Sequence, residues 1–203
     1  MNKTIAIVGS AGYLKDKGLG REIDAHDKVL RVNLNFQLID KYKKDIGKRT
    51  DIIYLCVRAY KQYRNKLLKV PEQSEVYIKD KPLRRLHRHQ CIPNTGIIAI
   101  IDFAVKGYDV YVYGMDFYAG INNGIVPERA ILKGKTKVPK VDVSDVYLEG
   151  YKDLYGEIEV GHVGGLNDLK ILLEYKKQYK NIFFDKHLEE VINKTIKHYE
   201  LKD

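Results

Sequence analysis

The feature that most constrains the fold is an alternation of short apolar runs with helical patterns. Six runs are rich in β-branched and aromatic side chains, and helical patterns separate most of them. This order is typical of a parallel sheet covered by helices on both faces. We therefore predict a doubly wound, mostly parallel Rossmann-like α/β sheet of about six strands, with ligands beyond the carboxyl ends of the strands. The runs are 4–8, 28–32, 51–56, 75–78, 109–113 and 181–184, and the helical patterns lie near 36–45, 59–69, 95–106, 167–179 and 186–200.

The segment 119–160 interrupts this alternation. It contains Gly120, the run Asn122-Asn123-Gly124 and a cluster of lysines, but no clear strand pattern. A loop of this length without elements of its own is usually either a functional lid or a disordered connection. Because it follows the fifth apolar run directly, where a lid would close over a ligand, we predict a lid. We expect one domain over 1–203, with the lid inside it.

Positive charge is concentrated in two places. The formal net charge is +9, and ten Lys and Arg residues between 58 and 91 face only three acidic ones. A second basic run occupies 133–140. Such patches suit phosphate groups of nucleic acid, of anionic lipid or of nucleotide-linked substrates. A solvated, lysine-rich face explains the same pattern, so charge alone does not choose a ligand.

The cysteine content and the apolar pattern bear on the compartment. The chain has two cysteines, Cys56 and Cys91, too few for a disulfide framework or a four-cysteine zinc site. No run of ~18 apolar residues is present, and the N-terminal residues lack the long apolar core of a signal peptide. We therefore expect a reduced, cytoplasmic setting.

A glycine-containing turn follows the first apolar run. Gly9, Ser10 and Gly12 stand where backbone amides can approach and hold an anion. Their spacing fits neither a dinucleotide fingerprint nor a Walker A loop. Asn33 ends the second run, beside this turn, where its amide suits a sugar hydroxyl or a base edge. Alternatively, Asn33 caps the next helix.

Three blocks of sequence then point to a family. Residues 8–33 with 46–50 closely resemble the large sialyl motif of family 29 sialyltransferases, and 93–97 with 108–114 resemble the small sialyl motif. Gly161-His162, followed by Asp168, is similar to the very small motif. The string 114–118 is also similar to bacterial family 42 sialyltransferases. The resemblance spans roughly 5–180, and the three blocks occur in the family's order.

The resemblance implies an enzyme. Such glycosyltransferases use a CMP-activated acidic sugar, invert the anomeric centre and need no metal or other cofactor. His162 matches the catalytic base, which suits its intrinsic pKa. Tyr118 matches the tyrosine that donates to the leaving phosphate. Taken singly, a histidine like His162 is more often a surface or capping residue, and Tyr118 has the alternative of a tyrosine packed at a strand end.

The resemblance also implies a donor-binding set. Asn94, Thr95 and Gly96 open a helix whose free amides suit the donor carboxylate, although Thr95 reads equally as a plain N-cap. Asp116 and Phe117 match positions that contact cytidine and ribose. The full predicted donor set is Gly9, Ser10, Gly12, Asn33, Asn94, Thr95, Gly96, Gly114, Asp116 and Phe117.

Several positions depart from the family pattern. Ser10 stands where most members have Asn, and Asn94 stands where family 29 usually has Ser. Ala6 and Tyr108 replace the cysteines of a disulfide found in secreted animal enzymes, which agrees with a cytoplasmic protein. These departures leave nucleotide binding better supported than sialic acid specificity, and Kdo is an alternative sugar.

Three hypotheses remain open. The first is a transferase acting on a glycan or glycolipid acceptor, with 58–91 touching an anionic membrane and no nucleic acid involved. The second is a family member that binds CMP but has lost transfer. The third is a basic nucleic-acid-binding module built on 58–91, although no recognised nucleic-acid motif is present.

Overall fold

The structure is a computed structural model that describes residues 2–56, 59–61, 64, 71, 73–78, 93–128, 147–149 and 165–201. All structural statements below refer to these residues. Four predictions fall largely or wholly outside them: the helix near 59–69, the two basic runs, the lid over 119–160, and the catalytic assignment of His162.

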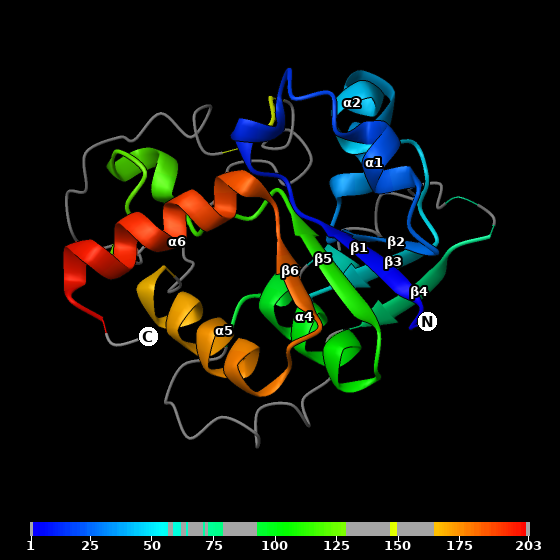
Figure 1. Cartoon of the computed structure of the whole chain (residues 1–203). Coiled ribbons are helices and arrows are strands. Elements are labelled where there is room, and N and C mark those ends of the chain that lie inside the picture. Colours follow the sequence, from blue (N-terminus) through cyan, green and yellow to red (C-terminus); the bar gives the residue numbers. More distant parts are fainter. Residues whose placement is uncertain are drawn as a thin grey trace.

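The strands form one six-stranded parallel sheet in the order β4-β3-β2-β1-β5-β6 (Figure 1). The predicted doubly wound α/β class is confirmed, and every predicted strand is present. Four strands have the predicted bounds, whereas β3 and β6 are shorter than the predicted runs 51–56 and 181–184. The strands are β1 (Thr4–Val8), β2 (Lys28–Val32), β3 (Ile52–Leu55), β4 (Glu75–Ile78), β5 (Asp109–Tyr113) and β6 (Ile182–Phe184).

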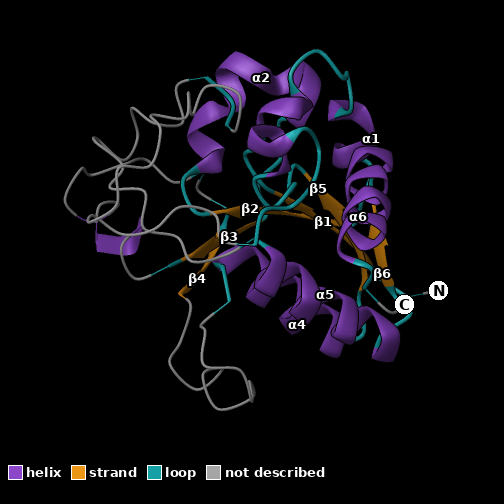
Figure 2. Cartoon of the chain, turned by 90° about the vertical axis from the view of Figure 1, so that its left-hand side faces the viewer, coloured by secondary structure: helices purple, strands orange, loops and turns teal. Residues whose placement is uncertain are grey.

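Helices cover both faces of the sheet. Figure 2 shows α4 and α5 below the strands and α1 and α2 above them. The sequence did not predict α1, because its five residues are too few to display a helical period. The helices are α1 (Gly20–Asp24), α2 (Ile39–Ile46), α4 (Thr95–Val105), α5 (Leu166–Gln178) and α6 (Lys186–Tyr199), with short 3-10 turns η1 (Gly12–Leu14), η2 (Asn35–Leu38) and η4 (Ala119–Asn122).

The main core lies on the face of α4 and α5. Nearly all of α4 is buried, which explains why its sequence is apolar all round rather than amphipathic. The stripe predicted on α6 packs against this core through Leu188, Val191 and Ile192. A smaller core lies on the opposite face, between β1, β2 and the helices α1 and α2. No helix in the described part of the chain is long and apolar enough to cross a membrane.

A buried arginine fixes the turn after α2. Arg31 on β2 is fully buried and donates hydrogen bonds to the carbonyl oxygens of Ile46 (2.6 Å) and Arg49 (2.8 and 3.0 Å). Burial lowers the pKa of Arg31 to about 10, against the opposing effect of Asp24 and Asp51, so the guanidinium stays charged at neutral pH. Arg31, a residue of the first sequence block, therefore joins β2 to the turn after α2 by hydrogen bonds.

Candidate functional site

The sheet order creates a crevice beside β1. The chain passes from β1 to β2 on one side and returns later to β5 on the other. This change of direction makes a topological switch point between β1 and β5, and open α/β sheets bind ligands beyond the carboxyl ends of the strands at such a point. The predicted donor residues come from the turns after β1, β2 and β5 and from the start of α4.

Two glycines let the turns after β1 and β5 cross in contact. The Gly9 amide donates to the Tyr113 carbonyl at 2.8 Å, and the Ala11 amide donates to the Gly114 carbonyl at 3.0 Å. A Cβ on Gly9 would lie 2.2 Å from the Gly114 oxygen. Gly114 has a φ of +69°, and a Cβ there would lie 2.5 Å from Leu14 Cδ1. Both glycines are thus required by the fold of the site, whatever ligand it takes.

Gly96 serves a similar close approach. A Cβ on Gly96 would lie 2.8 Å from both Sδ and Cε of Met115, directly after Gly114. The first turn of α4 therefore packs against the turn after β5. The structure brings Gly9, Gly96 and Gly114 together around one methionine. Gly12 opens η1, the next turn of the chain.

An asparagine that the sequence did not single out supports the glycine turn. Asn35 is fully buried, and its Nδ2 donates to the Gly9 carbonyl (2.6 Å) and to Ser10 Oγ (3.1 Å). Because the Gly9 carbonyl can only accept, the orientation of the Asn35 amide is fixed. Its Oδ1 has no hydrogen-bond partner among the described residues. The side-chain amide of Asn35, at the start of η2, is therefore the hydrogen-bond partner of Ser10.

Asn33 joins the ends of β2 and β3. It adopts a left-handed backbone with a φ of +55°, and its Oδ1 accepts from the Cys56 amide at 2.9 Å. The alternative that Asn33 caps the next helix is wrong, because Leu34 occupies the N-cap position of η2. Contact between Asn33 and a donor stays a prediction.

Asp168, the described residue of the third sequence block, meets the second block at the start of α4. Asn94 occupies the N-cap position without a side-chain cap bond, and Thr95 is the first helical residue, so the alternative of Thr95 as N-cap is wrong. The Asn94 amide donates to Asp168 Oδ1 of α5 at 3.4 Å. The first turn of α4 packs beside the turn after β5, and the Asp168 carboxylate already accepts from the amide of the N-cap residue.

The turn after β5 is tightly constrained. Phe117 and Tyr118 both have positive φ, and the Asp116 carboxylate accepts from the amides of Tyr118 (3.1 Å) and Gly120 (3.3 Å). Burial raises the pKa of Asp116, and these two amide bonds oppose that rise. The Phe117 side chain lies in the main core. Asp116 and Phe117 therefore shape the turn, and their predicted contacts with a nucleotide stay predictions.

The described ends of the predicted lid segment pack on the body. The Leu148 amide donates to the Ser10 carbonyl at 2.9 Å, and Tyr147 pairs with Ala11. The ring of Tyr118 meets that of Tyr147 edge to face, 6.2 Å between centroids. At the other end, the Val126 amide donates to Thr195 Oγ1 of α6 at 3.0 Å. Residues 147–149 thus lie against the glycine turn and Tyr118.

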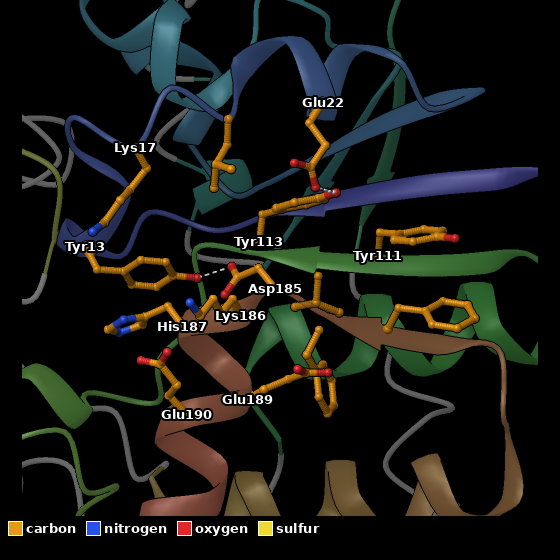
Figure 3. Close-up of a pocket in the computed structure, with 14 residues that line it drawn as sticks. Tyr13, Lys17, Glu22, Tyr111, Tyr113, Asp185, Lys186, His187, Glu189 and Glu190 are labelled. Atoms are coloured by element: carbon orange, nitrogen blue, oxygen red, sulfur yellow. Dashed lines mark hydrogen bonds between the residues drawn. The ribbon is translucent and has the colours of Figure 1, made fainter.

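A tyrosine connects the two crossed turns to β6. The hydroxyl of Tyr13 accepts from the Gly114 amide at 2.7 Å and donates to the Asp185 carboxylate (Figure 3). Its ring stacks on His187, with centroids 3.9 Å apart. Burial and the nearby Asp185 raise the pKa of Tyr13 well above its ordinary value, so the phenol stays neutral. The only sequence signal for this role was a tyrosine inside the glycine turn.

Known proteins resemble the region that supplies these turns. Residues 2–81 match the model described as glycosyltransferase family 29 (sialyltransferase). The chain is similar to family 29. A beta-galactoside alpha-2,6-sialyltransferase 2 of Takifugu rubripes is 50% identical over 50 residues, which are 25% of this chain and 9% of that protein. An alpha-N-acetylgalactosaminide alpha-2,6-sialyltransferase 1 of Mus musculus is 49% identical over 47 residues, 23% of this chain and 9% of that protein.

Solved structures agree on the fold. A crystal structure of a mammalian sialyltransferase superposes with a TM-score of 0.54 at 17% identity, covering 91% of this chain and 69% of that one. A complex of a mammalian sialyltransferase with Gal-beta-1-3GalNAc-ortho-nitrophenol gives 0.53, also at 17% identity, covering 91% of this chain and 70% of that one. The resemblance to family 29 is confirmed. The aligned segments cover 9% of the length of each of these two curated relatives.

Proposed function

We propose that the chain is a glycosyltransferase that moves sialic acid, or a related acidic sugar such as Kdo, from a CMP-activated donor to a glycan hydroxyl. The observation that carries this proposal is the family 29 match over residues 2–81. That segment supplies the glycine turn, Asn33 and Asn35, which together form one side of the crevice beside β1. The described geometry supports a ligand there by placing the turn after β5 and the start of α4 around the same edge.

In the proposed reaction, the crevice holds the donor through backbone amides and the side chain of Asn33, and it uses no metal. The amides of the turn after β1 and the side chain of Asn33 hold the nucleotide. The first-turn amides of α4 hold the sugar carboxylate.

The proposed chemistry is a single displacement with inversion. The acceptor hydroxyl oxygen forms a bond to the anomeric carbon while the bond from that carbon to the CMP phosphate oxygen breaks. His162 takes the acceptor proton, and the Tyr118 hydroxyl donates to the departing phosphate. His162 lies outside the described residues and outside the matched segment 2–81, so its place in the reaction rests on the resemblance of Gly161-His162 and Asp168 to the very small sialyl motif.

The first test is calorimetric titration of the whole chain with CMP, with and without EDTA, beside UMP and AMP. We expect cytidine-selective binding that EDTA leaves unchanged. Absence of binding to all three nucleotides would overturn the donor-site assignment. Salt-dependent binding to DNA without CMP binding would favour the nucleic-acid hypothesis instead.

The second test separates transfer from binding. We predict that His162→Ala lowers turnover of a CMP-sugar by ~10²–10⁴-fold, the usual contribution of a general base, while CMP affinity is retained. CMP binding by the unmodified chain without donor hydrolysis or transfer would identify a family member that has lost catalysis. Near-normal activity of His162→Ala would remove His162 from the mechanism.

A further inference from the structure

A cavity lies over the face of β5 and β6 that is opposite the main core, and it reaches Tyr13 beside the crossed turns. Its volume is about 630 Å³, within the range of small-ligand sites. The strands alternate, so Val110, Val112 and Ile182 face the main core, whereas Tyr111 and Phe183 form the floor of this cavity. η1 and α1 form one wall, and the first turn of α6 forms the other (Figure 3). We name it the β5–β6 groove.

Aromatic rings make up the floor of the groove. Tyr111 and Phe183 are cross-strand partners whose rings stack at 4.8 Å between centroids. The His26 ring, which does not line the cavity, is tilted against Tyr111 with centroids 4.4 Å apart. Phe183 is 39% exposed, although its neighbours on β6 turn inward or are half-buried. Strand pairing between β5 and β6 fixes the positions of Tyr111 and Phe183, so the exposed part of Phe183 is an apolar surface in a defined place.

Both carboxylates and lysine ammonium groups line the rim of the groove. Two of its carboxylates already have partners in the protein: Glu22 accepts from the Tyr113 hydroxyl at 2.8 Å, and Asp185 accepts from Tyr13. The remaining charged side chains are exposed, and none of them forms an ion pair with another described residue. They are Lys17, Lys186, Glu189 and Glu190.

The charge of the rim selects among ligand classes. Four carboxylates and two ammonium groups line the groove of a chain whose overall charge is +9. An anion such as CMP or an acidic sugar would meet the excess of carboxylates. A cation would meet repulsion from Lys17 and Lys186 as well as attraction to the carboxylates, so a cationic sugar serves as a comparator in the test. A neutral polyhydroxyl ligand can donate to carboxylates, accept from lysines and lay its C–H face on a ring.

We propose that the β5–β6 groove binds a neutral pyranose unit of a glycan. The ring of Phe183 supports the apolar face of the sugar, and Glu189 bonds its hydroxyls. Lys17 and Glu190, which lie at the opposite end of the groove from Tyr111 (Figure 3), bond the next unit of the glycan. This site is distinct from the donor crevice, and it needs no transfer activity. One side chain connects the two, because Tyr13 lines the groove and bonds the Gly114 amide of the crossed turns.

The test is saturation-transfer NMR on the whole chain with lactose and maltose as neutral probes, and with glucosamine and glucuronic acid as charged comparators. We expect saturation of the neutral sugars, and saturating CMP should not displace them. Absence of signal from both disaccharides, or stronger binding of either charged sugar, would overturn the proposal. Displacement by CMP would also overturn it, because it would place the sugar in the crevice.

Variants locate the binding. Phe183→Ala removes an exposed ring and should weaken the neutral sugars by about two- to tenfold. Val105→Ala is the matched control, since Val105 is 56% exposed at the end of α4 and lines no part of the groove. Glu190→Gln should also weaken binding while CMP affinity stays unchanged. Equal affinities in Phe183→Ala, Glu190→Gln and Val105→Ala would reject the groove as the site.

Discussion

The crossing of the turns after β1 and β5 has no room for a methyl group, whereas the groove over β5 and β6 is open and lined by side chains. At the crossing, the Gly9 and Gly114 backbones touch each other directly. In the groove, the same strand β5 presents Tyr111 and Tyr113 to a cavity of about 630 Å³. Substitutions should therefore change stability at the crossing and ligand binding in the groove.

The largest effect should come from Gly114→Ala. A left-handed alanine costs ~1–2 kcal/mol, and the contacts with Leu14 Cδ1 and the Gly9 oxygen should add the ~1–3 kcal/mol of overpacking. Gly18→Ala is a matched control, because Gly18 has nearly the same φ (+68° against +69°) and no atom within 4 Å of an added Cβ. Chemical denaturation measures both. Equal losses would show that the crossing is not sterically closed.

The next largest loss of stability should come from removing the side-chain amide of Asn35, which donates to the turn after β1. Asn35→Ala removes two hydrogen bonds and leaves the Gly9 carbonyl without its side-chain donor, so we expect a loss of ~1–3 kcal/mol in the free energy of unfolding. Ser10→Ala removes only the 3.1 Å bond and should cost less. Denaturation curves for both variants test this order. A larger loss for Ser10→Ala would contradict the assigned geometry.

Tyr13→Phe tests the side chain that joins the two regions. It keeps the ring on His187 but leaves the Gly114 amide and the Asp185 carboxylate without the bridging hydroxyl. We expect a loss of ~1–2 kcal/mol of stability. The control is Tyr111→Phe, which should be nearly neutral because the Tyr111 hydroxyl has no hydrogen bond to another described residue. A neutral Tyr13→Phe would show that the bridge contributes nothing to stability.

The smallest effect is a pH dependence beside the groove. Burial lowers the pKa of His26 from its ordinary value, against the opposing effect of Glu22 and Asp27. Between the folded pKa and about 6.5, the unfolded chain binds more protons, so the His26 contribution is present above 6.5 and is lost as pH falls. Stability measured from pH 7 to pH 5 should fall more steeply in the unmodified chain than in His26→Gln. Parallel curves would contradict this.

The sequence predicted some parts of the site well and missed others. Strand ends could be read from apolar runs, so the positions of Gly9, Asn33 and Gly114 at one edge followed from the parallel topology. Asn35 was missed because its partners come from another strand end, and Tyr13 was missed because Asp185 lies 172 residues further along the chain. Local patterns carry no information about such pairs.

The amino-acid sequence alone determined the α/β class, the strands and the motif order, because periodicity and turn chemistry are local properties of the chain. Only the tertiary structure decided what the motif residues do. It placed Phe117 in the core and gave the Asp116 carboxylate two backbone amide donors. It also showed that the close contact between the two turns requires glycine at both Gly9 and Gly114. It also produced the β5–β6 groove, because a cavity depends on which elements pack together and how much of a sheet face they cover.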